Sequence, residues 1–251
     1  MKITEPEIVS FRQSGHVRVD GMFDAKELVE ITGWVDELQD WPETPGQHMM
    51  YFEQSLDKSP RRILNRMENF SPYHAGMREL LRGTAMLGAS EALFGEAAVL
   101  FKEKINFKLP GGGGFEPHQD VQAGWDDYAS IYITAMVSID ETNENNGCLE
   151  MGIWDHRHEM IGELWEPLTE QQLKDVAFVP CPAKAGDVVY FDSYVPHRSA
   201  PNLTETPRRV LYITYNKRSD GDHRERYYAD KRRSYPPDCE READKVYEYR
   251  V

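Results

Sequence analysis

The pattern of apolar residues changes near residue 99, and this change limits the folds open to the chain. From about Val99 onward, short runs rich in β-branched and aromatic residues are separated by turns rich in Gly and Asn. The clearest runs are VLFKEKINFKL, ASIYITAMVSI, DVVYFD and RRVLYITYN. Short strands with this punctuation are typical of an antiparallel sandwich or barrel. Because the strands follow helices instead of alternating with them, the sequence predicts an α+β fold.

Before residue 99 the sequence favours helices. Asp24 and Glu27 have the spacing of a capping box, and apolar residues recur at helical spacing after them. A second helical run is expected from about Ala75 to Phe94. The stretch between them, 41–74, is rich in proline and aromatic residues, so we expect it to be irregular. Long loops of this kind often act as lids or binding loops, which makes this stretch a candidate lid.

The length of the chain fits a single domain with three parts. Its 251 residues are enough to bury a substantial core. We expect a mainly helical, lid-like part at 1–98, a β core at 99–216 and a C-terminal extension at 217–251. The extension is strongly charged, so it is expected to be exposed and packed by its tyrosines.

Charge and composition exclude several classes of function. The net charge is −14, from 29 Lys+Arg against 43 Asp+Glu. Such a surface repels phosphate backbones and anionic lipids, so neither nucleic acid nor a membrane is an expected partner. The sequence has no signal-peptide pattern, and its cysteines indicate no disulfide framework (Cys148, Cys181 and Cys239). We therefore expect a cytoplasmic protein with a small-molecule substrate, either a monomer or a homodimer.

The motif PHQD at 117–120 carries most of the functional information. His118 and Asp120 are two residues apart, so on a strand, or at its end, both side chains point to one face. His197 follows the strand-like run DVVYFD and can supply a third ligand. Two histidines and one carboxylate form the facial triad that binds non-haem iron(II) and leaves positions open for other ligands.

An HxD pair alone arises often by chance and is usually a surface turn. Three further features make this pair more informative. The glycine-rich loop PGGGG precedes it, two strand-like runs follow it, and a basic residue stands eleven positions after the second histidine. That residue, Arg208, would be a buried charge if it pointed into a barrel, and a dicarboxylate could pair with it. Ser199 could add a hydrogen bond to the same carboxylate. The alternative is that Arg208 or its neighbour Arg209 lies on a solvated strand face.

These motifs, taken in order, resemble the phytanoyl-CoA dioxygenase family over about residues 100–216. The resemblance rests on HQD, NNGCLEM, GDVVYFDSYVPHRSAPN and the strand that begins at Arg208. It implies a double-stranded β-helix core (a jelly roll, as in cupins) with N-terminal helices packed outside. It also implies iron(II), the cosubstrate 2-oxoglutarate and dioxygen, and a hydroxylase activity.

The resemblance also assigns roles to individual residues. His118, Asp120 and His197 correspond to the metal ligands of the family. Arg208 and Ser199 correspond to the residues that hold the distal carboxylate of 2-oxoglutarate, and Asn106 is a candidate for its other end. Halogenating relatives replace the metal carboxylate with a small residue, so the presence of Asp120 favours hydroxylation.

One segment departs from the family pattern. After NNGCLEM many members read Pro-Gly-Ser-His, whereas this chain reads GIWDHRHE. The segment borders the active-site mouth in the family, so the difference is expected to change substrate contacts and not the metal. His156 and His158 form a second H-x-H here. We interpret them as structural or near the substrate, because the sequence offers no matching third ligand.

The substrate is less well determined than the chemistry. Five residues are candidates for the pocket: Trp125, Tyr128, Tyr132, Tyr51 and Arg62. Aromatic faces can hold an ammonium group by cation–π contact. Arg62, Lys104 or Lys108 could hold an anion such as a phosphonate or carboxylate. Ordinary packing for Trp125 and Tyr128, and a solvated position for Arg62, are the alternatives.

The stretch WPETPG…MYFE is similar to the bacterial branch of the family that hydroxylates aminophosphonates such as 2-aminoethylphosphonate. Another small polar metabolite or an amino-acid-derived natural product is the alternative substrate. An acyl-CoA thioester is disfavoured, because an acidic surface offers little to its phosphates. Two further alternatives stay open: a cupin-like enzyme or a non-catalytic cupin-like binding protein, neither of which uses 2-oxoglutarate, and a catalytically silent family member.

Overall fold

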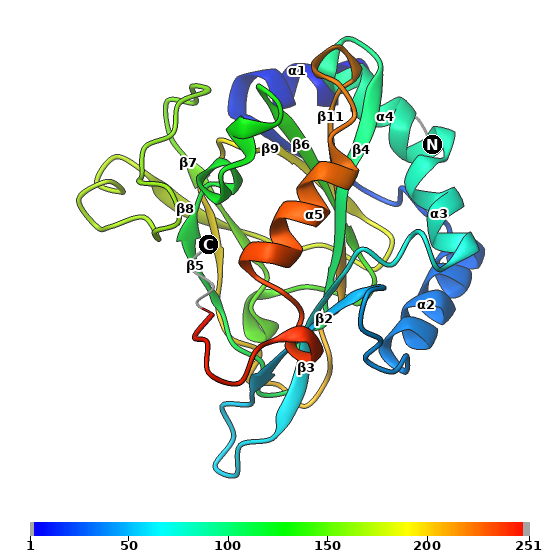
Figure 1. The fold of residues 1–251 in the computed structure, drawn as a ribbon. Helices are drawn as coiled ribbons and strands as arrows, with labels where there is room; N and C mark the ends of the chain where they lie inside the picture. Colours follow the sequence, from blue (N-terminus) through cyan, green and yellow to red (C-terminus); the bar gives the residue numbers. More distant parts are fainter. Residues whose placement is uncertain (1–2, 248–251) are drawn as a thin grey trace.

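Eight consecutive strands form two antiparallel sheets in this computed structural model, which describes residues 3–247 (Figure 1). The strands are β4 (Ala98–Asn106), β5 (Phe115–His118), β6 (Tyr132–Ser138), β7 (Leu149–Ile153), β8 (Ala177–Cys181), β9 (Val188–Asp192), β10 (His197–Ser199) and β11 (Val210–Lys217). One sheet contains the order β9-β6-β11-β4, and the other has the order β5-β10-β7-β8. This is the strand order of a jelly roll. The predicted α+β class and jelly-roll core are therefore confirmed.

Three further strands extend the larger sheet. β1 (His16–Val19) pairs with β9, while β3 (Arg62–Glu68) and β2 (Met49–Gln54) continue the sheet beyond β4. The expectation that 41–74 is irregular was therefore wrong, and the first 98 residues are less helical than expected. The prolines in this region fall outside the two strands, so they do not interrupt the ladder.

Four helices precede the jelly roll. They are α1 (Glu5–Ser14), α2 (Ala25–Gln39), α3 (Ala75–Arg82) and α4 (Thr84–Phe94). The predicted start of α2 is correct, because the Asp24 side chain accepts hydrogen bonds from the backbone of Lys26 and Glu27. The second predicted run is two helices, separated where Gly83 has an extended backbone. Figure 1 shows α2, α3 and α4 along one side of the larger sheet, outside the barrel, where their apolar faces join the main core.

The C-terminal part contains a helix, α5 (Arg224–Ser234), that lies across the larger sheet (Figure 1). Tyr227 and Tyr228 are buried, as expected for packing by tyrosines. The expectation of an exposed extension was wrong for this helix, because Arg224 forms a buried ion pair with Glu103 on β4. Residues 248–251 of the predicted extension lie outside the described residues.

Short 3-10 helices complete the described structure: Asp120–Ala123, Trp125–Asp127, Glu144–Asn146, Arg218–Asp220 and Asp238–Glu240. The first of them directly follows β5, so it places Asp120 just beyond His118. None of the helices between residues 3 and 247 combines the length and the apolar character that crossing a membrane would require. The cytoplasmic location stays a prediction.

Candidate metal centre and substrate cavity

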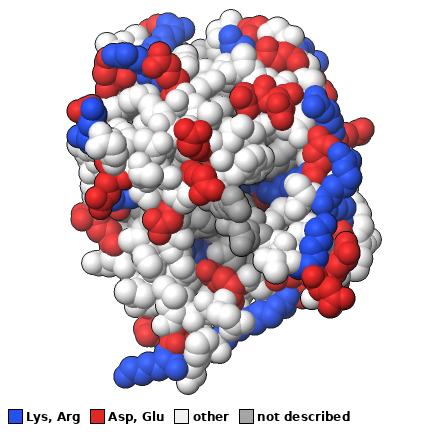
Figure 2. Space-filling view, turned by 60° about the vertical axis from the view of Figure 1, so that its left-hand side comes forward, with Lys and Arg blue, Asp and Glu red and all other residues white. Residues whose placement is uncertain are grey.

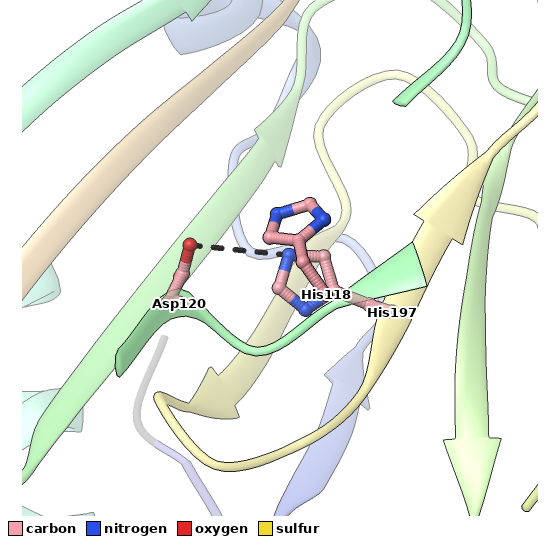
Figure 3. A group of neighbouring side chains, drawn as sticks. All are labelled: His118, Asp120 and His197. Carbon is pink, nitrogen blue, oxygen red and sulfur yellow. Dashed lines mark ion pairs between the residues drawn. The ribbon is translucent and has the colours of Figure 1, made fainter. Parts of the chain in front are cut away.

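The three predicted metal ligands lie together. β5 and β10 pair so that His118 stands opposite His197, and Asp120 follows in the next turn (Figure 3). The potential ligand atoms all lie within 4.8 Å of one another. Nε2 of His197 is 3.9 Å from Oδ1 of Asp120. Residues 79 positions apart in sequence are thus brought to one point by a single antiparallel strand pair.

The hydrogen bonds of the two imidazoles decide which nitrogen faces the centre. Nδ1 of His118 donates to the Glu116 carbonyl at 2.7 Å, and Nδ1 of His197 donates to the Val195 carbonyl at 3.0 Å. Each Nε2 then carries a lone pair. Burial, followed by the neighbouring His197, lowers the pKa of His118 to about 3, which keeps this imidazole neutral. Two nitrogen lone pairs and a carboxylate therefore face one another, an arrangement that requires a cation.

A pair of threonines orients the carboxylate. The Thr134 hydroxyl donates to Oδ2 of Asp120 at 3.3 Å and is itself 3.0 Å from the Thr214 hydroxyl. Burial would raise the pKa of Asp120, but His197 and Lys104 lower it, so the group is ionised. The second oxygen, Oδ1, faces the two histidines.

Arg208 is the most unusual charge near this centre. Its side chain is only 1% exposed, yet Nε and Nη1 have no hydrogen-bond partner among residues 3–247. The neighbouring Arg209 is the paired residue instead, since it forms ion pairs with Asp140 and Asp36. A buried guanidinium with unpaired N–H groups is costly, so Arg208 fits a site for an anionic ligand.

The other two predicted cosubstrate residues lie beside the triad. Asn106 and Ser199 line a small cavity that also touches all three predicted ligands. Oδ1 of Asn106 has no hydrogen-bond partner in the described structure. Ser199 accepts a hydrogen bond of 2.8 Å from Lys108, a buried lysine whose pKa is lowered to about 6 by burial and by Arg208. Lys108 therefore adds a second basic group on the Arg208 side.

A larger cavity of about 690 Å³ opens beside Asp120. Its wall is rich in aromatic rings, contributed by Trp125, Tyr128, Trp165, Tyr227 and Tyr235. Three lysines also line it: Lys102, Lys104 and Lys231. Burial, followed by repulsion from Lys102, lowers the pKa of Lys104 to about 8. Figure 2 shows Lys and Arg side chains in a band along the right-hand side of one face, although the whole chain is acidic.

Three of the five predicted substrate residues lie at a cavity. Trp125 and Tyr128 line the larger one, and Tyr51 lines a neighbouring cavity of about 280 Å³ that reaches His118. Tyr132 lies behind the wall, where its hydroxyl donates to the Trp125 carbonyl at 2.6 Å. Arg62 lies on the exposed β2–β3 hairpin, paired with Glu43. The structure therefore gives no support to Tyr132 or Arg62 as substrate contacts, because neither lines these cavities.

Sequence reasoning missed most of the basic wall. Lys102 and Lys231 were not among the predicted residues, although both line the larger cavity. One signal was available, because Lys102, Lys104 and Asn106 occupy alternate positions of β4 and therefore share a face. No local signal marks Lys231, because it reaches the site from α5.

The second H-x-H has a third neighbour after all. Nε2 of His156 lies 2.8 Å from Oδ2 of Asp192, and Nε2 of His158 lies 3.4 Å from the same oxygen. The expectation of no matching third residue was therefore wrong; the missing group comes from the end of β9. These contacts attach the long β7–β8 loop, which carries Trp165, to the larger sheet.

Two glutamines attach the same loop to the metal motif. The Gln119 amide donates to the Glu159 carbonyl at 3.0 Å. The Gln122 amide donates to the carbonyls of Glu163 at 2.8 Å and Glu166 at 2.7 Å. The loop that departs from the family pattern thus forms part of the cavity wall, next to the predicted metal ligands.

Comparison with known proteins agrees with this arrangement. The family model described as phytanoyl-CoA dioxygenase matches residues 11–210. The chain is 40% identical over 247 residues to a 2-aminoethylphosphonate dioxygenase from an uncultured bacterium, covering 97% of this chain and 93% of that protein. It is 36% identical over 235 residues to a methylphosphonate hydroxylase from Gimesia maris, covering 93% of this chain and 88% of that protein.

A solved structure supports the fold. The structure of EctD from S. alaskensis with 2-oxoglutarate and 5-hydroxyectoine superimposes with a TM-score of 0.72 at 19% identity, covering 87% of this chain and 77% of that chain. At this identity the likeness shows a shared architecture. Family match, relatives and fold agree, so the chain belongs to the phytanoyl-CoA dioxygenase family of iron(II)- and 2-oxoglutarate-dependent oxygenases.

Proposed function

We propose that this protein hydroxylates a small phosphonate, with 2-aminoethylphosphonate as the first candidate, and that His118, Asp120 and His197 hold its iron(II). The relative of 40% identity is named for that compound, and a second relative is named for methylphosphonate. Both likenesses extend over more than nine-tenths of this chain. Identity at this level supports the class of substrate more strongly than the individual compound.

The donor set fits iron(II). Two neutral imidazoles and one carboxylate on one face of an ion are typical of non-haem iron oxygenases. Their Nδ1 hydrogen bonds and the Thr134 contact hold them in this orientation. Bound iron(II) with 2-oxoglutarate supplies oxygen activation, in which one oxygen atom enters a C–H bond of the substrate and the cosubstrate becomes succinate and carbon dioxide.

The unpartnered buried guanidinium of Arg208 is the observation that carries the oxygenase assignment. A cupin-like protein without a dicarboxylate cosubstrate has no use for such a charge. The distal carboxylate of 2-oxoglutarate would satisfy Nε and Nη1 of Arg208. Ser199 is linked to this side through Lys108, which donates to its hydroxyl and accepts from the Arg208 backbone. Asn106, with its own unpartnered oxygen, lines the same small cavity as Ser199 and the triad.

The cavity supports a small zwitterionic substrate. Lysine ammonium groups on one side suit the phosphonate oxygens, and aromatic rings together with Asp127 suit an ammonium group. The β7–β8 loop closes one side through Trp165 and so reduces the access of water. The chain's own task is thus to position a C–H bond near Asp120 and to keep that region dry.

Succinate formation by the iron-loaded protein tests this proposal. With 2-aminoethylphosphonate we expect succinate release well above the rate without substrate, with equimolar hydroxylated product seen by mass spectrometry. Methylphosphonate and a phosphorus-free amino acid serve as comparison substrates. If the protein binds iron(II) and 2-oxoglutarate but none of the phosphonates causes succinate release, the substrate assignment is overturned. Failure to bind 2-oxoglutarate would overturn the oxygenase assignment.

A further inference from the structure

The wall of the larger cavity gathers basic side chains around one buried carboxylate. Lys102, Lys104 and Lys231 line this cavity, and Arg66 lines the neighbouring cavity that reaches His118. The carboxylate among them is Glu68, which is 0% exposed.

The carboxylate of Glu68 already interacts with three of these basic groups. Nζ of Lys231 lies 2.8 Å from both carboxylate oxygens, and Nε of Arg66 lies 2.9 Å from one of them. Lys102 is more distant, at 3.8 Å. Burial alone would raise the pKa of Glu68, but Lys102, Lys231 and Arg66 together hold it far below its usual range. This carboxylate has no capacity left for a fourth cation.

Lys104 is the cation without an ion pair. No ion pair or hydrogen bond joins its ammonium group to any residue of the described chain, 3–247, and its Nζ lies 4.9 Å from the centroid of the Tyr212 ring. The charges of Asp120 and Glu68 favour its protonated form, but burial and Lys102 outweigh them and lower its pKa. Its side chain nevertheless lines both the larger cavity and the small cavity of the triad. Poorly solvated ammonium groups without partners are costly, and proteins retain them mainly where a ligand completes the pair.

The acids near Lys104 already have other roles. Asp120 belongs to the triad, where a bound cation would take up its charge. Asp230, at the cavity wall, is paired with Arg233, and the exposed Asp127 is assigned above to the ammonium end of the substrate. Glu103 is paired with Arg224 through two hydrogen bonds. An anion in the larger cavity would therefore supply the ion pair that Lys104 lacks.

We propose that Lys102 and Lys104 form an anion subsite for a tetrahedral, doubly charged group, which we assign to the phosphonate end of the substrate. The two lysines stand at alternate positions of β4, so both ammonium groups reach the cavity from one strand face. Three phosphonate oxygens offer enough acceptors for both lysines, whereas a carboxylate carries a single charge. The identity of the ligand rests on the proposed function; the existence of the subsite rests on the charges alone.

Anion binding can be measured without turnover. Manganese(II)-loaded protein with 2-oxoglutarate, kept free of oxygen, is titrated calorimetrically with methylphosphonate and with inorganic phosphate. The variants are Lys102→Met and Lys104→Met, which keep most of the apolar stem. Lys26→Met, on the exposed surface of α2, is the matched control for loss of one positive charge. Lys104→Arg retains the charge and tests whether charge suffices.

We expect each methionine variant to bind methylphosphonate about 10- to 100-fold more weakly, as loss of a charge-assisted hydrogen bond predicts. Lys104→Arg should keep most of the affinity, and Lys26→Met all of it. The affinity for 2-oxoglutarate should stay unchanged. The melting temperature of Lys104→Met should not fall, because the substitution removes an unpaired charge and breaks no ion pair.

Several outcomes would overturn the subsite. Wild-type protein that binds neither anion would do so, as would methionine variants that bind them like wild type. A Lys104→Met variant that loses 2-oxoglutarate affinity instead would assign this lysine to the cosubstrate. The proposed function can fail separately from the subsite. If the anions bind in a lysine-dependent way but no phosphonate is turned over, the proposed function is wrong and the subsite stands. If both methionine variants keep the wild-type turnover and KM for 2-aminoethylphosphonate, the subsite is wrong and the proposed function stands.

Discussion

Two groups of two histidines and one aspartate lie near the ends of strands, one on each sheet, and they differ in the hydrogen bonds that their atoms make. The inner triad consists of His118, Asp120 and His197; the outer group consists of His156, His158 and Asp192. In the inner triad Nε2 of His197 lies 3.9 Å from Oδ1 of Asp120, too far for a hydrogen bond. In the outer group a histidine nitrogen and the aspartate lie 2.8 Å apart, a full hydrogen bond.

The difference follows from where the imidazole hydrogens point. In the inner triad each Nδ1 hydrogen is used by a backbone carbonyl, so lone pairs face the carboxylate. In the outer group the Nε2 hydrogen of His156 points at Asp192, and the other Asp192 oxygen accepts from the Tyr194 backbone. The inner triad needs a cation, whereas the carboxylate of the outer group is satisfied by hydrogen bonds to both of its oxygens. The same three residue types therefore make a candidate metal site in one place and a loop attachment in the other.

Removing an inner ligand should have the largest effect. Asp120→Ala or His197→Ala should reduce bound iron from one per chain to none and lower succinate formation by at least about 100-fold, since loss of a ligand exceeds loss of its supporting hydrogen bonds. Metal analysis after desalting measures the stoichiometry. Asp192→Asn is the matched control and should keep one iron per chain. Two metals per wild-type chain, with one lost in Asp192→Asn, would remove the distinction between the groups.

Arg208→Ala should have the next largest effect. It removes a paired, two-pronged contact, so KM for 2-oxoglutarate should rise by about 10- to 100-fold. Steady-state kinetics with varied cosubstrate measures it. The neighbouring Arg209→Ala loses ion pairs with Asp140 and Asp36 and should leave this KM unchanged. An equal rise in both variants would mean that the inner site does not depend on the unpartnered guanidinium.

Weakening the hydrogen bonds of the outer group should change substrate binding and leave metal binding unchanged. Asp192→Asn weakens the attachment of the loop that brings Trp165 to the cavity. We expect KM for the substrate to rise by a few-fold, about 1 kcal/mol or less for a weakened hydrogen bond. The iron content and the KM for 2-oxoglutarate should not change. A fall in iron affinity would show that the outer group supports the inner one.

The smallest expected effect is a pH dependence of loop attachment. The hydrogen bond to Asp192 raises the pKa of His158 above its ordinary value of 6.5. The stabilising contribution is therefore fully present below that value and is lost as pH rises through the raised pKa. Limited proteolysis of the 154–176 loop should accelerate modestly from about pH 6 to about pH 9, within the range where histidine titrates. His158→Gln should abolish this trend, and persistence of the trend would assign it to another group.

Much of the site could be predicted because its signals are local. His118 and Asp120 are two residues apart, and Arg208 begins a recognisable strand-like run. The helix start at Asp24 was equally readable, since a capping box lies within four residues. The β2–β3 hairpin was not predicted, because its strands are defined by pairing with each other and, for β3, with β4, and not by strict alternation in their own sequence.

The sequence by itself determined the class of chemistry. It contains the ligands for a metal, a basic residue that can pair with a dicarboxylate, and the strands that carry both. Only the tertiary structure decided which charges are balanced. Lys231 meets Glu68 across 163 positions, and Asp192 meets His156 across 36, so neither contact has a local signature. Lys104 looks like any surface lysine in the sequence; it becomes a candidate for substrate binding because the fold places it beside Lys102 at the cavity wall, without an ion pair to residues 3–247.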